Sequence, residues 1–225
     1  MSIKMIVFDM AGTTIDEDNI VYKTLHKSIN HYGVTVDLQA VLAIGAGQEK
    51  LTAIKDIVSK FGSKEDLEKA PDMYHYFINN LNAAYEEFDI KAMQYAENVL
   101  VNLRSKNILV VLNTGYDRST AQFILNKIKW VQLYHYDLLV TASDVEKNRP
   151  APDMIHYAMN LFSIKDAQEI VKVGDSKIDI EEGKNANCLY SIGITTGAQT
   201  NAQLLEAKPD AIINDLNEFL TFLKI

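Results

Sequence analysis

Short apolar runs that end in polar or glycine-containing turns recur along the chain. We predict that each run is a buried strand, because a strand covered on both faces is apolar along its whole length. Between the runs, apolar residues recur at i, i+3, i+4 and i+7, which is the spacing of one helix face. Strand and helix therefore alternate, and this predicts an α/β fold with a doubly wound parallel sheet. The predicted strands span residues 5–8, 108–112, 138–140, 170–173, 189–194 and 211–213, and the clearest helices span 121–128 and 216–223.

The segment that follows the first strand breaks this alternation. Between about residues 20 and 93 the apolar positions have helical spacing, and no run resembles a strand. Pro71 indicates the start of a helix inside this segment. The sequence thus predicts two domains, a core of residues 1–16 and 95–225 and an inserted α-helical domain of residues 17–94.

Composition narrows the class of protein. The 225 residues are 48% apolar and 23% charged, which is enough to bury a large core and a smaller insert. The formal net charge of −8 and the lack of a dense basic cluster argue against nucleic acid as a partner. The single cysteine, Cys188, excludes an intramolecular disulfide, and no run approaches the roughly 20 apolar residues of a membrane-spanning helix. We therefore expect a reduced, cytoplasmic location without a membrane partner.

Polar and glycine residues follow four of the predicted strands directly or within a short loop. In open α/β sheets, ligands bind beyond the carboxyl ends of the strands, so these segments are the candidates for a functional site. Together they offer a nucleophile, hydrogen-bond donors, a cation and metal ligands. The four segments are residues 9–14, 113–116, 148–152 and 174–179.

Three of these residues suit phosphoryl transfer. The carboxylate of Asp9 can attack phosphorus and divide one difficult displacement into two easier ones. Thr114 offers a hydroxyl and neighbouring backbone N–H groups to a phosphoryl oxygen, and Arg149 offers an always-charged guanidinium. Each residue alone would equally suit a turn, a helix cap or a surface charge. Their occurrence in order after separate strands favours the functional interpretation.

The same segments predict an oxygen-only metal site. Mg²⁺ prefers six oxygen ligands and keeps several waters. Asp9, Asp175 and the backbone carbonyl of Ala11 are the predicted ligands, and Asp179 is predicted to support the metal shell from behind. Asp175 and Asp179 also have an interpretation without a metal. They would lie at the solvated start of a helix, where two acids interact favourably with the helix dipole.

The four segments resemble the four motifs of haloacid dehalogenase hydrolases. Within that superfamily they look most like phosphonoacetaldehyde hydrolases, or phosphonatases, and phosphonatase-like hydrolases. The resemblance covers essentially the whole chain and implies a Rossmann-like core, a mobile helical cap domain and a Mg²⁺ cofactor. It implies catalytic roles for Asp9, Lys50, Thr114 and Arg149. It also implies substrate or phosphate contacts at Met10, Gly47, Lys50, Thr114, Gly115 and Arg149.

Ala11 favours the phosphonatase branch of the resemblance. Phosphatases and phosphomutases of the superfamily usually have a second aspartate there, which protonates the leaving oxygen and later activates water. Phosphonatases have alanine, because their leaving group is a carbon. The segment Gly47-Gln48-Glu49-Lys50 also resembles the phosphonatase cap, in which the lysine forms a Schiff base with the substrate aldehyde. Such a lysine has to be partly neutral, which requires burial or a cationic neighbour.

Some positions depart from the phosphonatase motif or also fit another function. The phosphonatase cap motif has a histidine where this chain has Ala53, and a methionine where it has Ala46. Lys50 would also suit a solvated charge or a simple substrate clamp. Ala11 would also suit an esterase whose leaving group is protonated by another residue or by water.

The favoured function is Mg²⁺-dependent hydrolysis of a small phosphorylated metabolite through an aspartyl-phosphate, with a phosphonate such as phosphonoacetaldehyde as the favoured substrate. One alternative is a phosphate-monoester phosphatase of the phosphoglycolate phosphatase type. Another is a non-catalytic protein that binds a phosphate ligand. A mutase is disfavoured, because relaying phosphate between hydroxyls requires the acid that Ala11 replaces. The substrate is the expected partner, and a homodimer is an open option.

Overall fold

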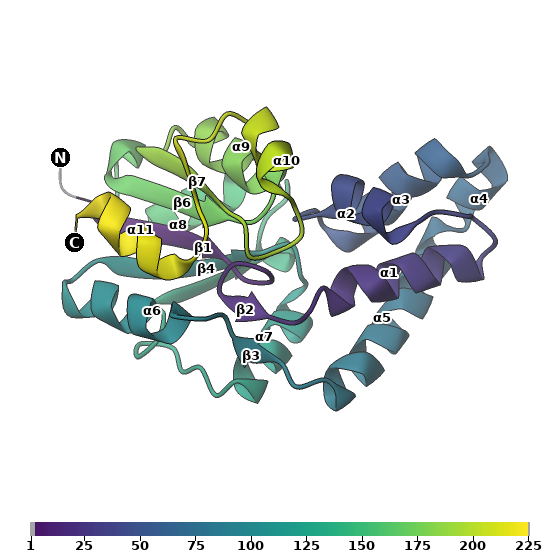
Figure 1. Cartoon of the computed structure of the whole chain (residues 1–225), viewed down its shortest axis with the longest axis horizontal. Helices are drawn as coiled ribbons and strands as arrows, with labels where there is room; N and C mark the ends of the chain where they lie inside the picture. The colour runs from purple at the N-terminus through teal and green to yellow at the C-terminus, as the bar shows by residue number, and fades with distance from the viewer. Residues whose placement is uncertain (1–2, 225) are drawn as a thin grey trace.

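The computed structural model, which describes residues 3–224, has a six-stranded parallel sheet at its centre (Figure 1). All six predicted strands are present, and their order in the sheet is β5-β4-β1-β6-β7-β8. The predicted fold class, a doubly wound parallel sheet of the Rossmann-like type, is therefore confirmed. The strands are β1 (Met5–Asp9), β4 (Leu109–Thr114), β5 (Leu138–Thr141), β6 (Ile170–Gly174), β7 (Tyr190–Ile194) and β8 (Ala211–Ile213).

Helices cover both faces of the sheet, because successive side chains of a strand point to opposite faces. Ile6 and Phe8 of β1 belong to the larger apolar cluster, where the Phe8 ring centre lies 5.4 Å from that of Phe219. Met5 and Val7 belong to a second cluster on the other face. The first face is covered by α6 (Ala96–Ser105), α7 (Arg118–Lys127) and α11 (Leu216–Leu223). The second is covered by α8 (Asp153–Leu161) and α9 (Lys177–Asn185), and α10 (Asn201–Glu206) packs on α9.

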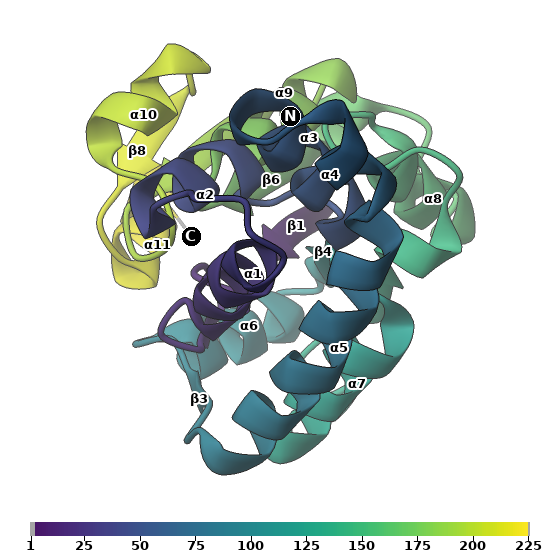
Figure 2. The same cartoon turned by 90° about the vertical axis from the view of Figure 1, so that its right-hand side faces the viewer.

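Five further helices lie beside the sheet, beyond the carboxyl ends of its strands (Figures 1 and 2). They occupy the segment predicted to be a helical insert, and their apolar faces pack against one another. Leu25, Ile54 and Phe77, from three different helices, are fully buried there. The inserted helices are α1 (Ile20–His31), α2 (Leu38–Gly45), α3 (Lys50–Phe61), α4 (Lys64–Glu68) and α5 (Ala70–Glu87).

The helix α5 illustrates how the sequence specifies these elements. Pro71 lies in its first turn, as predicted, where the missing N–H group of proline costs no hydrogen bond. Its buried side chains, among them Met73, Leu81 and Tyr85, recur on one face, and the opposite face is polar. Within residues 3–224, no helix combines the length and the apolar character that crossing a bilayer requires.

A short pair of strands lies where the sequence predicted none. The strands β2 (Ile15–Asp16) and β3 (Lys91–Ala92) pair antiparallel, and β3 falls inside the segment expected to be purely helical. Two-residue strands are too short to show a period of two, so the pattern did not indicate them. The chain passes from the core to the inserted helices after β2 and returns to the core at β3, and the pair holds these two connecting segments side by side. The Met93 N–H group also donates to the Thr14 carbonyl at 2.9 Å. The domain boundaries at residues 17 and 94 lie next to this pair and stay a prediction.

Candidate active site

The predicted site residues meet at the carboxyl ends of β1, β4 and β6. Asp9 is the last residue of β1, Thr114 is the last residue of β4, and Asp175 follows β6 directly. The sheet continues from β1 to β4 on one side and to β6 on the other, and such a switch point is where open α/β sheets bind ligands. All three side chains are buried, and so are those of Arg149 and Asp179.

Arg149 lies directly against the predicted nucleophile. Its Nη1 atom is 2.7 Å from Oδ1 of Asp9 and 2.8 Å from Oδ1 of Asp179. Its Nη2 atom donates to the side-chain oxygen of Asn113 at 2.9 Å. The guanidinium is therefore held from several sides, and an anion that approaches Asp9 would meet it.

Three aspartates offer ligand oxygens that all lie within 4.8 Å of one another: Asp9, Asp175 and Asp179. Burial raises the pKa of Asp175 well above its usual range, and the other two carboxylates add to the rise. Burial also raises the pKa of Asp9, although Arg149 opposes this. At Asp179 burial acts in the same direction, but Arg149 and Lys172 outweigh it and hold the pKa of that carboxyl below its usual range. Asp179 is paired with two cations and Asp9 with Arg149, whereas Asp175 has no cationic partner among residues 3–224.

Two charged residues of this cluster were missed by the sequence interpretation. Lys172 and Glu182 are completely buried, and each lies against residues of the aspartate cluster or their partners. The Nζ atom of Lys172 lies 2.8 Å from Oδ1 of Asp179 and donates to Asn113 at 2.7 Å. Glu182 accepts from Asn113 at 2.9 Å and lies 3.2 Å from Nε of Arg149. A lysine inside the apolar run 170–173 was the available signal, because a buried charge requires a partner.

The charge balance of the cluster fits a divalent cation. Four buried carboxylates lie against two buried cations, and a third buried cation, Lys50, lies in the adjoining cavity, so negative charge is in excess when all four carboxylates are ionised. The donors nearest to that surplus are carboxylate oxygens, the ligands that Mg²⁺ prefers. The carboxylates are those of Asp9, Asp175, Asp179 and Glu182, and the cations are Arg149 and Lys172.

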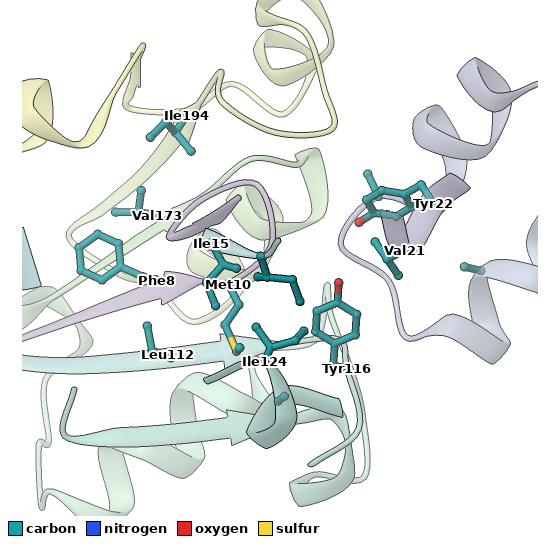
Figure 3. Close-up of a cluster of buried hydrophobic side chains, with 14 of the residues drawn as sticks. Phe8, Met10, Ile15, Val21, Tyr22, Leu112, Tyr116, Ile124, Val173 and Ile194 are labelled. Carbon is teal, nitrogen blue, oxygen red and sulfur yellow. The ribbon is translucent and has the colours of Figure 1, made fainter. Parts of the chain in front are cut away.

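The turn after β1 brings backbone to the same place. Met10 points into the apolar core, so only its backbone is available to a ligand (Figure 3). Ala11 lines the cavity that also contains Asp9. Gly12 has a φ of 79°, and a Cβ atom there would lie 2.5 Å from Oδ2 of Asp175. Only glycine allows the turn to press this closely against Asp175.

Lys50, from the inserted helices, reaches the same cavity. It is the first residue of α3 and is only 6% exposed. Its Nζ atom donates to the Gln48 carbonyl at 2.6 Å and lies 5.4 Å from the ring centres of Tyr22 and Tyr116. Burial lowers the pKa of Lys50 to about 8. The lysine is therefore partly neutral near physiological pH, as a Schiff-base lysine has to be.

The loop before α3 rests on the core at two glycines. A Cβ atom on Gly115 would lie 2.7 Å from the Gln48 carbonyl oxygen, and one on Gly47 would lie 2.3 Å from Oγ of Ser176. Gly47 also has a φ of 74°, which favours glycine. The contacts bring Lys50, Thr114, Arg149 and Asp9 to the walls of one small cavity.

Comparison with known proteins agrees with this arrangement. The model of the haloacid dehalogenase-like hydrolase family matches residues 6–192. The chain belongs to that family. A phosphonoacetaldehyde hydrolase from Latilactobacillus sakei is 29% identical over 206 residues, which cover 83% of this chain and 74% of that protein. A protein of the same name from Bacillus cereus (strain AH820) is 26% identical over 88% of this chain and 78% of that protein.

Solved structures share the fold of this haloacid dehalogenase-like hydrolase. A phosphonoacetaldehyde hydrolase-like protein from Oleispira antarctica superposes with a TM-score of 0.83 at 21% identity, over 100% of this chain and 92% of that one. A predicted phosphoglycolate phosphatase from Haemophilus somnus superposes with a TM-score of 0.76 at 18% identity, over 99% of each chain. These comparisons and the family match confirm the predicted superfamily and its hydrolase class.

The two positions at which the chain departs from the phosphonatase motif, Ala46 and Ala53, do not line the cavity. Ala53 is completely buried among the inserted helices, where a Cβ atom on Gly45 would lie 3.4 Å from its own. Ala46 is buried as well. Apolar packing therefore takes the place of the phosphonatase histidine at position 53. Any titratable group near Lys50 has to be supplied by another position of the chain.

One such group is Glu17, which lies between β2 and α1, where the chain passes from the core to the inserted helices. It is only 2% exposed, and its Oε2 atom accepts from the Val21 N–H group and the Tyr85 hydroxyl, each at 2.9 Å. The Tyr85 and Tyr116 hydroxyls are 2.7 Å apart. Burial raises the pKa of Glu17 to about 7. The Glu17-Asp18 pair looks polar in the sequence, so no pattern indicated this burial.

The raised pKa of Glu17 predicts a dependence of stability on pH. The fold favours the protonated carboxyl, so this contribution to stability is complete below the ordinary pKa of 4.5 and is lost as pH rises through about 7. Glu17→Gln keeps a neutral acceptor and cannot ionise. We expect similar free energies of unfolding for wild type and variant at pH 4.5, and a variant more stable by up to about 3 kcal/mol at pH 8. Urea unfolding at both values measures this. Glu87→Gln, an exposed change on α5, is the control, and equal differences at both pH values would contradict the prediction.

Proposed function

We propose that this hydrolase cleaves the carbon–phosphorus bond of a small phosphonate with a carbonyl group beta to phosphorus, with phosphonoacetaldehyde as the favoured substrate. The observation that carries the proposal is the position of Lys50, a buried amine whose pKa is lowered to about 8, in the same cavity as Asp9 and Arg149. Ala11 supports it, because no carboxylic acid stands there to protonate a leaving oxygen. The two relatives described above are both named phosphonoacetaldehyde hydrolase, which also supports the proposal.

Mg²⁺ is the proposed cofactor. Asp9, Asp175 and the backbone carbonyl of Ala11 would hold it, and Asp179 would keep the shell in place. The fit rests on the excess of negative charge in the buried cluster and on its all-oxygen donors. When bound, the ion would neutralise phosphoryl oxygens and favour the ionised form of Asp9.

Asp9 is the proposed nucleophile. Its carboxylate oxygen attacks phosphorus, and the carbon–phosphorus bond breaks as the phosphoryl group moves to Asp9. Thr114 and Arg149 line the same cavity and would donate to the phosphoryl oxygens. The backbone N–H groups of Met10 and Gly115 are proposed as further donors. Water then hydrolyses the aspartyl-phosphate, which releases phosphate and restores the carboxylate.

Lys50 is the proposed electron sink. Its neutral amine condenses with the substrate aldehyde and releases water, and the imine nitrogen takes up a proton from solvent, which gives a protonated imine. When the carbon–phosphorus bond breaks, its electron pair forms a carbon–carbon double bond while the carbon–nitrogen π pair moves to nitrogen. The carbon therefore leaves as an enamine rather than as a bare carbanion. Protonation of the enamine carbon and addition of water release acetaldehyde and the free amine.

The inserted helices are proposed to act as a mobile cap, residues 17–94. In this structure the loop that carries Gly47 and Lys50 rests on Gly115 and Ser176, so the cap completes the cavity. A substrate would enter when this contact opens, and closing would exclude water from the imine. Gly47 is the proposed point at which cap backbone approaches the substrate.

A phosphate-monoester phosphatase of the phosphoglycolate phosphatase type is the second candidate, favoured by Ala53 in place of the phosphonatase histidine. A second cavity, of about 150 Å³, adjoins Lys50 and argues against that substrate. Glu49 and Asp117 line it. Burial raises the pKa of Tyr74, which also lines this cavity, and the two carboxylates raise it further. The two acids would disfavour a leaving group with its own carboxylate, and the Lys50 amine on the same wall would oppose them only in part. A non-catalytic phosphate-binding protein is a third candidate, and turnover of any phosphonate or phosphate ester would exclude it.

The metal proposal predicts that chelation abolishes turnover and that added Mg²⁺ restores it. Asp175→Asn removes one charged ligand, so we expect a higher Mg²⁺ concentration for half-maximal activity and a loss of roughly 10²-fold or more. Phosphate release over a Mg²⁺ titration measures both. Asp56→Asn, an exposed change on α3, should behave as wild type. Full activity of the wild-type enzyme in excess chelator would refute the metal site.

The Lys50 proposal predicts a covalent adduct. Borohydride added with phosphonoacetaldehyde should reduce the imine, inactivate the enzyme and leave a mass increase on the peptide that contains Lys50. Lys50→Arg keeps the charge but cannot form the imine, so phosphonate turnover should fall by roughly 10²–10⁴-fold, the usual effect of losing one catalytic group. Lys55→Arg, on the exposed face of the same helix, is the control. Turnover of phosphoglycolate by Lys50→Arg, without any wild-type adduct, would support the ester phosphatase instead.

A further inference from the structure

Glu17 is a buried carboxylate that the proposed reaction does not use. Burying an ionisable group costs free energy unless it is paired, and the two donors that Glu17 accepts from, Val21 N–H and Tyr85 O–H, are neutral. Its position is also unusual, because it lies in the crossing between β2 and α1, where the chain leaves the core for the inserted helices. A side chain held at such cost, at the junction of two parts, suggests a function.

A chain of hydrogen bonds leads from Glu17 towards the amine of Lys50. Tyr85, on α5, donates to Glu17 at 2.9 Å, and its hydroxyl oxygen is 2.7 Å from that of Tyr116. Tyr116 follows β4, so this second contact joins an inserted helix to the core. The Tyr116 ring centre lies 5.4 Å from the Nζ atom of Lys50, and Tyr22 lies at the same distance from it. Figure 3 shows Tyr22 and Tyr116 approaching this junction from its two sides.

We propose that Glu17, acting through Tyr85 and Tyr116, positions the Lys50 amine between two tyrosine rings and balances its charge when the inserted helices lie on the core. Because Tyr85 belongs to the inserted helices and Tyr116 to the core, the chain is complete only when the two parts are in contact. Glu17 is a positioning residue in this account, since it does not touch the reacting atoms. The inference rests on the proposed function of Lys50 as the residue that condenses with the substrate.

The electrostatic surroundings of the two groups support this coupling. Burial lowers the pKa of Lys50 and Arg149 lowers it further, while the carboxylates of Asp9, Glu49 and Glu17 raise it. Tyr22 and Tyr116, from the other packed elements, face it as neutral rings.

The same coupling acts on Glu17. Burial raises its pKa, and Val21 N–H, the Tyr85 hydroxyl, Lys50 and Lys23 lower it. Each of the two groups, Glu17 and Lys50, therefore favours the charged form of the other, and their pKa values of about 7 and about 8 are close together. Protonation of Glu17 thus favours the neutral amine that imine formation needs.

The test is the titration of Lys50 in the full chain, followed through the ¹³Cε signals of lysine-labelled protein. The Lys50 signal is assigned by its loss in Lys50→Arg. We expect a wild-type midpoint near pH 8. In Glu17→Gln the midpoint should fall by about half a pH unit or more, because a negative charge that favours the ammonium form is gone. Tyr85→Phe removes the hydroxyl that joins Glu17 to Tyr116, and we expect a smaller fall.

Glu87→Gln, exposed on α5, should leave the Lys50 midpoint unchanged. An unchanged midpoint in both folded variants, Glu17→Gln and Tyr85→Phe, would overturn the inference. If Glu17→Gln did not fold, Tyr85→Phe alone would decide, since it deletes a single oxygen. The readout needs no substrate, so a shifted midpoint together with no phosphonate turnover would support the positioning function and refute the proposed reaction. If both hold, the pH at which borohydride trapping is fastest should fall in Glu17→Gln as well.

Discussion

The surplus of buried negative charge at the carboxyl ends of β1 and β6 is the constraint on which the site depends. Carboxylates remain ionised in an apolar interior only when cations or donors compensate them. Arg149 and Lys172 compensate Asp179, and Asn113 ties both cations together. Asp9 keeps Arg149 as its partner, and Asp175 has no cationic partner among residues 3–224, so a divalent cation could bind between their carboxylates.

The core half of the site could be predicted from the sequence because parallel strands bring their carboxyl ends together. Asp9 and Asp175 are far apart in the chain, but each follows an apolar run, and the runs are adjacent in the sheet. The positions of the strands could be predicted as well, because a fully buried strand appears in the sequence as an apolar run of about the same length. Thr114 and Arg149 followed from the same rule, and the resemblance to known motifs added Lys50.

What could not be predicted depends on contacts between the inserted helices and the core. Glu17 looks like a solvated turn residue, and only the packing of α5 against the crossing buries it. The burial of Lys50 likewise requires the loop at Gly47 to rest on Gly115, a contact that no local pattern encodes. Lys172 is a different case, because a lysine in an apolar strand was a visible signal.

The proposed reaction requires phosphoryl transfer to Asp9 during turnover of a phosphonate that is held by Lys50. The most direct measurement is acid quenching of the enzyme during turnover of phosphonoacetaldehyde, followed by mass spectrometry of the peptide that contains Asp9. The account predicts a phosphoryl group on Asp9 that accumulates within one turnover and is absent in Asp9→Asn, which should fold normally and release no phosphate. Turnover of phosphonoacetaldehyde by Asp9→Asn at a rate near that of the wild type would contradict it.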